Sequence, residues 1–253
     1  ILLTAEELKS PVILGVSEGA GKYMTGFKTV AAMVKAMDEE LGITVPVALH
    51  LDHGSYEGCY KCIKAGFTSI MFDGSHLPFR ENLAITRHLV TLAHSKGISV
   101  EAELGTIAGS EDGIVNSEVI YADPQECYTL VTETQVDCLA AALGSTHGLY
   151  KGKARLGFTE MKAIAERVKV PLVLHGGTGI ADEDMRRAIA CGTAKINVNT
   201  ENMYAWCQQV KAIFAADTGH DVNDPRKVIA QGLQPVREMI ARRMALFGSE
   251  QRY

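Results

Sequence analysis

The sequence predicts an α/β protein with the architecture of a (β/α)8 TIM barrel, in which the first strand is missing from the sequence. Three observations predict this fold. Apolar runs typical of buried strands alternate with helical stretches, which is the pattern of βαβ units and a parallel sheet. The alternation occurs seven times before a longer helical segment. Several of the apolar runs also end in polar residues, as expected where strands of a parallel barrel deliver side chains to a shared mouth.

The predicted strands are the short apolar runs, taken in chain order. The first ten residues, ILLTAEELKS, are typical of the end of a helix and not of the start of a domain. The runs that follow are PVILGV (11–16), PVALHL (46–51), TSIMF (68–72), ISVEA (98–102), VDCLAAAL (136–143), PLVL (171–174) and AKINV (194–198). Side chains alternate between the two faces of a strand, so these runs can present polar groups on one face.

The predicted helices occupy the stretches between these runs. They are expected at 27–41, 55–65, 79–96, 124–134, 158–169, 181–191 and 201–215, with a longer helical tail at about 226–247. Because the chain begins with helix-like residues, we expect a strand and most of a helix to lie upstream of residue 1.

We expect residues 1–253 to form a single barrel domain with a C-terminal helical extension from about residue 225. The length is ample for one large core, and no proline-rich or serine-rich linker divides the chain. A doubly wound open sheet is the competing architecture. That architecture predicts glycine-rich phosphate turns early in the chain, whereas here polar residues end nearly every strand.

Composition narrows the functional class. The formal net charge of −5 and the sequence pI of about 5.9 argue against a general nucleic-acid binder. No apolar run reaches the roughly 18 residues that a membrane span needs, and no signal peptide is visible. Six scattered cysteines predict a reducing, cytoplasmic protein without a disulfide scaffold. The C-x-x-C pair Cys59 and Cys62 is interpreted as helix thiols, with a redox or metal role as the alternative.

Three histidines stand where apolar runs end, each followed by glycine: His53, His147 and His175. A catalytic zinc site needs three protein ligands and an open position. Three strand ends of a barrel could bring these side chains to one ion, and the alternative is three unrelated histidines at the rim. The sequence therefore favours a metal site at the barrel mouth.

The order of residues around the first of these histidines needs a local turn. His50 and Asp52 share strand parity, so His53 would face the opposite side if the strand continued. We expect the strand to end near Asp52 and the turn at Gly54 to swing His53 inward. His76 is a weaker ligand candidate.

Carboxylates also gather at predicted strand ends. Asp73 ends one strand, and Glu101 and Glu103 lie on one face at the end of another. Such groups near a cation can ligate it or orient its ligands, and salt bridging in the mouth is the alternative. Glu111 lies in GTIAGSEDG, where neighbouring glycines predict a mobile loop that is poorly ordered, or turned away from the three histidines, when no substrate is bound.

Two segments that precede predicted helices are candidate anion sites: HGGTG (175–179) and NVNTEN (197–202). Backbone N–H groups and the helix dipole can point at a phosphate there. Barrels commonly bind phosphate at the loops after the last two strands. A metal site beside a phosphate site predicts a metal-assisted reaction on a small phosphorylated molecule.

Taken together, LHLDHGS, FDGSHLPFREN, VEAELGTIAGSEDG, GSTHGLYKG, LVLHGGTGI and KINVNTE closely resemble the class II, zinc-dependent fructose-bisphosphate aldolases. The resemblance covers nearly the whole chain in the same order. It implies reversible cleavage of fructose 1,6-bisphosphate to dihydroxyacetone phosphate and glyceraldehyde 3-phosphate in glycolysis and gluconeogenesis. It also implies a catalytic Zn²⁺, possible use of a second divalent ion and of Na⁺ or K⁺, and a cytoplasmic homodimer or homotetramer.

The resemblance also implies roles for individual residues. The three histidines would bind zinc, and Asp73 and Glu103 would bind a second ion or support the first. Asp52 would be the acid/base at the C4 hydroxyl, and Glu111 would exchange the proton on the dihydroxyacetone phosphate carbon. Residues implied to bind the substrate and its phosphates are Ser17, Gly148, Lys151, Gly176, Thr178, Asn197, Asn199 and Thr200. Asn197 would lie beside the reacting carbons, and Ser17 would contact the other end of the sugar.

Three alternatives stay open at this point. Tagatose-1,6-bisphosphate aldolase uses the same site on the C4 epimer. A metal-dependent hydrolase on a barrel usually opens with an H-x-H pair on its first strand, and here the nearest pattern is His50 to His53 on an interior strand. A metal-binding barrel without catalysis is the third. In the aldolase family a first strand also contributes a substrate-facing asparagine, which is not found in this sequence.

Overall fold

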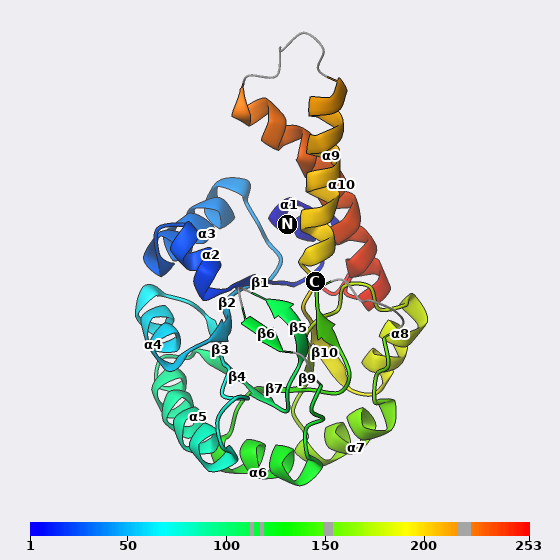
Figure 1. Ribbon diagram of the computed structural model, residues 1–253. Helices are drawn as coiled ribbons and strands as arrows, with labels where there is room; N and C mark the ends of the chain where they lie inside the picture. The colour runs from blue at the N-terminus through cyan, green and yellow to red at the C-terminus, as the bar shows by residue number, and fades with distance from the viewer. Residues whose placement is uncertain (112–113, 117–118, 149–153, 217–223) are drawn as a thin grey trace.

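Seven parallel strands form a curled sheet at the centre of the protein (Figure 1), in the order β1-β2-β3-β4-β7-β9-β10. The computed structural model describes residues 1–111, 114–116, 119–148, 154–216 and 224–253. The strands are β1 (Val12–Val16), β2 (Val47–Gly54), β3 (Ser69–Phe72), β4 (Ser99–Leu104), β7 (Cys138–Ala141), β9 (Leu172–Leu174) and β10 (Thr193–Ile196). Each strand lies beside the one before it in this series, which is the order of a barrel and not of a doubly wound sheet.

Helices surround the sheet on its outer side (Figure 1). They are α1 (Leu2–Leu8), α2 (Glu18–Tyr23), α3 (Phe27–Leu41), α4 (Tyr56–Ala65), α5 (Phe79–His94), α6 (Pro124–Thr134), α7 (Phe158–Val168) and α8 (Asp182–Ala190). Two further helices, α9 (Thr200–Ala216) and α10 (Pro225–Phe247), pack against each other and extend away from the ring. The barrel-type fold and the helical tail predicted from the sequence are therefore confirmed.

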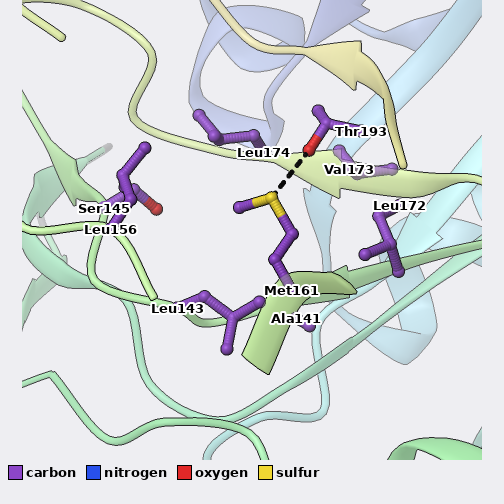
Figure 2. Close-up of a pocket in the computed structure, with 9 residues that line it drawn as sticks. All are labelled: Ala141, Leu143, Ser145, Leu156, Met161, Leu172, Val173, Leu174 and Thr193. Atoms are coloured by element: carbon purple, nitrogen blue, oxygen red, sulfur yellow. Dashed lines mark hydrogen bonds between the residues drawn. The ribbon is translucent and has the colours of Figure 1, made fainter. Parts of the chain in front are cut away.

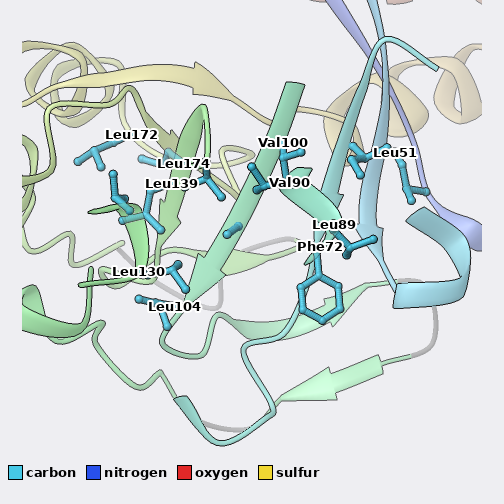
Figure 3. Close-up of a cluster of buried hydrophobic side chains, with 14 of the residues drawn as sticks. Leu51, Phe72, Leu89, Val90, Val100, Leu104, Leu130, Leu139, Leu172 and Leu174 are labelled. Carbon is cyan, nitrogen blue, oxygen red and sulfur yellow. The ribbon is translucent and has the colours of Figure 1, made fainter. Parts of the chain in front are cut away.

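Strand alternation separates an apolar outer face from a polar inner face. Val100 and Leu104 of β4 belong to the large hydrophobic cluster between sheet and helices, which Figure 3 shows. Glu101 and Glu103 of the same strand point to the other side and are also buried. Because side chains alternate with a period of two, the same strand that builds the core also places two carboxylates inside the ring.

A second sheet, which the sequence did not predict, lies near the middle of the ring. It has the order β6-β5-β8 and is formed by β5 (Ala108–Glu111), β6 (Ile114–Asn116) and β8 (Thr146–His147). The segment 108–111, expected to be a mobile loop, is thus a strand. Its Gly109 pairs with His147, so the backbone of this segment lies beside a predicted metal ligand and is not turned away from it. The alternative expectation, that the loop is poorly ordered without substrate, stays a prediction.

Helix ends follow the local sequence. Ser17 and Ser55 each stand just before a helix and accept a hydrogen bond from a backbone N–H three residues on. Asp224 caps α10 by accepting a hydrogen bond from the backbone N–H of Arg226, two residues on, and Pro225 occupies the first turn of that helix. Side-chain oxygens at these positions satisfy N–H groups that the helix leaves without partners.

One close approach fixes the packing of α9 on α10. A Cβ at Gly232 would lie 2.1 Å from Cδ1 of Trp206. Only glycine allows the indole ring this close to the backbone of the facing helix.

β1 and β10 stand at the two ends of the strand order in the described residues. The expected additional strand of an eight-stranded barrel is not part of these residues. None of the helices in the described part of the chain is both long enough and apolar enough to cross a membrane.

Candidate active site

The three predicted zinc ligands come together on one side of the curled sheet. His53 lies near the end of β2, His147 ends β8, and His175 directly follows β9. The ring centroids of His53 and His175 are 4.5 Å apart, those of His53 and His147 are 4.9 Å apart, and those of His147 and His175 are 6.0 Å apart. The carboxyl ends of parallel strands thus bring the three imidazole rings close together.

The backbone at His53 is what turns its side chain toward the others. Its φ angle is 45°, which is uncommon for a residue other than glycine. The pairing of β2 with β3 also shifts register between Leu51 and Gly54. The strand therefore runs on to Gly54 through an irregularity, and the expectation that it ends near Asp52 is wrong. Strain and a bulge, and not a strand end, reverse the direction of the side chain.

Two groups of side chains in the described residues could hold a metal ion. One consists of Asp52, His53 and His175, and the other of His53, Asp73 and Glu103, with ligand atoms within 4.8 Å of one another in each. Neither group includes His147, although its ring lies beside the others, and neither includes His76.

The second group contains a carboxylate suited to a cation. Oε2 of Glu103 is buried and has no hydrogen-bond partner in the described residues. Burial and the charge of Asp73 raise the pKa of Glu103 well above its usual value. Burial alone would also raise the pKa of Asp73, but hydrogen bonds from His53 Nδ1, at 2.9 Å, and from Ser75 reverse this, so that the pKa falls below its usual value. A cation here would compensate both carboxylates.

Asp52 lies at the edge of the first group with access to solvent. Its side chain is 14% exposed. Nδ2 of Asn197 donates a hydrogen bond to its Oδ1 at 2.8 Å and lies 3.2 Å from Nδ1 of His175. A fixed but accessible carboxylate next to a candidate metal ligand can take a proton from a bound molecule.

A buried network of charged side chains orients His175. Its Nε2 is 2.8 Å from Oε1 of Glu101, and Oε2 of Glu101 accepts a hydrogen bond from Nζ of Lys195 at 2.7 Å. Nζ of Lys195 is also 3.1 Å from Nε2 of His50. A carboxylate on one ring nitrogen fixes the orientation of the imidazole. The other nitrogen, Nδ1, then faces Nδ2 of Asn197 at 3.2 Å and Oδ1 of Asp52 at 3.9 Å.

The charges in this network compensate one another. Burial opposes ionisation of Glu101, but the charge of Lys195 and the hydrogen bond of His175 outweigh it and lower the pKa of Glu101 well below its usual value. Burial likewise opposes ionisation of Lys195, and Glu101 reverses the effect and raises the pKa of Lys195. Burial and the nearby Lys195 lower the pKa of His50 to about 4.

Sequence reasoning missed Lys195. It stands inside the apolar run AKINV, and a charged residue within a buried strand is a signal that a partner lies inside the ring. The parity of the strand gives the same indication, because Lys195 and Asn197 are two residues apart.

The two candidate phosphate loops lie side by side. The N–H of Gly177 donates to the carbonyl of Asn197 at 3.1 Å. Thr178 is buried, and Asn199 stands immediately before α9. A Cβ at Gly176, whose φ angle is 68°, would lie 2.2 Å from the carbonyl oxygen of Thr146, so this turn requires glycine. The first loop is separated from α8 by two residues, while the second leads directly into α9.

Four other predicted residues take different positions. Ser17 accepts a hydrogen bond from the N–H of Ala20 at 3.1 Å and so caps α2. Gly148 directly follows β8. Lys151 lies outside the described residues, and so does the side chain of Glu111, whose backbone ends β5.

Two further features of the structure are a pair of buried thiols and a small cavity. Cys59 and Cys62 are buried in α4, and burial raises the pKa of Cys62 to about 12, so this thiol stays protonated. None of the three histidines lines a small cavity of about 10 Å³, which Figure 2 shows. That volume is about what one water molecule needs. The cavity is lined by Ala141, Leu143, Ser145, Leu156, Met161, Leu172, Val173, Leu174 and Thr193.

Comparison with known proteins adds independent evidence. Residues 1–252 match the family model described as fructose-bisphosphate aldolase class-II. The chain is 58% identical over 250 residues to a protein named probable fructose-bisphosphate aldolase from Bacillus subtilis, covering 98% of this chain and 87% of the relative. It is 57% identical over 250 residues to fructose-bisphosphate aldolase from Geobacillus stearothermophilus, covering 98% and 86%. The crystal structure of the YdjI aldolase from Escherichia coli K12 has a TM-score of 0.84 and 35% identity, covering 99% of this chain and 86% of that one.

Proposed function

This chain belongs to the class II fructose-bisphosphate aldolase family, and from that premise we propose that it cleaves fructose 1,6-bisphosphate reversibly to dihydroxyacetone phosphate and glyceraldehyde 3-phosphate. The observation that carries the proposal is the convergence of His53, His147 and His175, with centroid separations of 4.5 to 6.0 Å, beside the accessible carboxylate of Asp52. The cleavage needs a base at the C4 hydroxyl, an electrophile at the C2 carbonyl and an acid that returns a proton to C3.

Asp52 is the proposed base. Its side chain is held by Asn197 and remains partly open to solvent, so it can accept the C4 hydroxyl proton as the bond between C3 and C4 breaks. In the reverse direction the same carboxyl returns the proton to the new hydroxyl. Asn197 fixes the carboxylate and, from the same amide, reaches His175.

The residues of the site fit a zinc ion. Three features fit a buried cation site: the clustered imidazoles, the carboxylate on the far nitrogen of His175, and the buried Oε2 of Glu103, which has no hydrogen-bond partner in the described residues. We assign His53, His147 and His175 as the ligands of catalytic Zn²⁺, with Asp73 and Glu103 as supports or ligands of a second divalent ion. Bound zinc would supply electrophilic polarisation of the C2 carbonyl.

Glu111 is the proposed acid at C3. It ends β5, whose Gly109 pairs with His147. The backbone of Glu111 is therefore anchored close to a proposed metal ligand, and a side chain there can exchange a proton with the C3 carbon of dihydroxyacetone phosphate.

The adjoining loops 175–179 and 197–200 are the proposed site of the dihydroxyacetone phosphate group. Gly148, Gly176, Thr178, Asn199 and Thr200 would bind it, with Na⁺ or K⁺ as a further counter-ion. The paired backbone of the two loops and the N-terminus of α9 support this role. Ser17 would contact the other end of the sugar, and Lys151 would lie near the site.

We also propose that residues 1–253 form one barrel domain with a C-terminal helical extension from about residue 225, and that the enzyme works in the cytoplasm as a homodimer or homotetramer. The large hydrophobic cluster includes residues from β1 to α10 and supports a single domain.

Steady-state cleavage of both C4 epimers tests the substrate assignment. The names of the relatives favour fructose 1,6-bisphosphate over the tagatose epimer. We expect a higher kcat/KM for fructose 1,6-bisphosphate. A higher value for tagatose 1,6-bisphosphate would reassign the substrate, and cleavage of neither would reject an aldolase function.

A further inference from the structure

One buried arginine joins the starts of two helices near the proposed phosphate loops. Arg243 of α10 donates from Nε and Nη2 to the two carboxylate oxygens of Glu201, each at 2.7 Å. Its Nη1 lies 3.9 Å from Oδ1 of Asp182 and has no hydrogen-bond partner in the described residues. The side chain of Arg243 is 9% exposed and that of Glu201 is 14% exposed. The guanidinium is therefore fixed in place by a two-pronged ion pair.

Both carboxylates stand in the first turn of a helix that follows a proposed phosphate loop. Glu201 comes directly after Thr200 at the start of α9, and Asp182 is the first residue of α8, three positions after Gly179. The loops themselves are joined by the hydrogen bond between Gly177 and Asn197. Arg243 thus contacts the first turns of α8 and α9, and the loops that precede these helices are joined by a backbone hydrogen bond.

Electrostatics makes this arrangement relevant to binding. A phosphate near a helix N-terminus gains from the N–H groups and the helix dipole. A carboxylate in the same first turn is stabilised by the same positive potential of the helix N-terminus, and its negative charge repels the phosphate. Glu201 would therefore weaken phosphate binding unless its charge were neutralised, and the partner that neutralises it is Arg243.

We propose that Arg243 is a positioning residue for the phosphate group of the substrate, because it neutralises the charge of Glu201 in the first turn of α9, beside the loops 175–179 and 197–200. The proposal rests on the proposed function for the identity of the phosphorylated substrate. It concerns binding and not the chemical step, so it predicts an effect on KM with little effect on kcat.

The test compares Arg243→Met with the zinc-loaded wild-type enzyme. We expect KM for fructose 1,6-bisphosphate and the inhibition constant of inorganic phosphate to rise roughly tenfold, while kcat and zinc content stay unchanged. Arg242→Met is the matched control, because the neighbouring Arg242 is 64% exposed and 3.5 Å from Asp182. It should leave both constants unchanged.

A double variant separates neutralisation from simple stability. Adding Glu201→Gln to Arg243→Met removes the uncompensated charge and should restore most of the phosphate affinity. A structural clamp would leave the double variant as impaired as the single one, and that result would overturn the proposal. If Arg243→Met does not fold, Arg243→Lys, which keeps the charge but loses the two-pronged geometry, should show a smaller rise in KM.

An unchanged KM in Arg243→Met, or a loss confined to kcat, would also overturn the proposal. Failure of the proposed function is distinguishable, because inorganic phosphate binding can be measured by calorimetry without turnover. Wild-type enzyme that binds inorganic phosphate but does not cleave the sugar would reject the aldolase function. The comparison of variants would still test Arg243.

Discussion

At the scale of single residues, two neighbours at the end of β2 are expected to have separate tasks. The side chain of Asp52 is partly exposed to solvent and accepts a hydrogen bond from Asn197. The ring of His53 lies against the rings of His147 and His175. Asp52→Asn should lower kcat by roughly 10²–10⁴-fold, the usual worth of a general base, and leave zinc content unchanged. His53→Asn should lose zinc. Equal zinc loss in both variants, measured by atomic absorption, would make Asp52 a support of the metal site and not the base.

Lys195 is the residue on which the buried network depends. It is the cation beside the fully buried Glu101, whose other oxygen orients His175. Lys195→Met should lower the free energy of unfolding by about 3–5 kcal/mol, the cost of a buried charge left without its partner, and should weaken zinc binding. Adding Glu101→Gln should recover most of the stability but not the zinc affinity, since the orientation of His175 is still lost. Denaturant unfolding and chelator competition measure the two effects, and a Lys195→Met protein as stable as wild type would contradict this account.

At the scale of elements, the strand β5 is expected to position Glu111. A Cβ at Gly109, whose φ angle is 109°, would lie 2.3 Å from the carbonyl oxygen of His147, so Gly109→Ala should push β5 away from β8. A displacement of about 1 Å can cost roughly 10²-fold in rate. We expect that loss in the exchange of the C3 proton of dihydroxyacetone phosphate with solvent.

The control for this prediction is Gly97→Ala. Gly97 also has a positive φ angle, 69°, but its Cβ would meet nothing within 4 Å. It therefore carries the backbone strain without the clash. Equal loss of proton exchange in both variants would show that strain, and not the position of β5, governs the effect.

The elements show which parts of the fold sequence patterns can reveal. The order of the seven strands and the tail helix followed from apolar runs, because burial against helices demands them. The glycines of the segment 108–111 predict a loop, because glycine is typical of turns, whereas its pairing with His147 depends on contacts that are distant in the chain. Lys195 was missed for the same reason, because its partner Glu101 is 94 positions away. The candidate residues at strand ends were predictable, since a strand end is a local feature.

At the scale of the whole molecule, acid should destabilise the fold through its polar interior. Burial and Lys195 lower the pKa of His50 to about 4 from a usual value of 6.5. Below pH 6.5, His50 binds a proton in the unfolded chain but not in the folded chain. The free energy of unfolding therefore decreases as the pH falls toward 4. The two pKa values correspond to about 3 kcal/mol of unfolding free energy lost over that window.

Replacement of His50 tests this pH dependence. The His50→Gln protein should show a flatter dependence of stability between pH 6.5 and 4. Both proteins should be measured with chelator present, so that zinc release does not contribute. Parallel pH profiles for the two proteins would assign the loss of stability to other groups.

The central claim is that the ring of strands assembles a metal-dependent aldolase site from His53, His147, His175 and Asp52. The measurement that tests it most directly is the rate of fructose 1,6-bisphosphate cleavage after dialysis against chelator, with and without added zinc, and after borohydride treatment in the presence of substrate. We predict that chelation abolishes cleavage, that zinc restores it, and that borohydride has no effect. Full activity in chelator, or a lysine trapped covalently to substrate by borohydride, would contradict the claim.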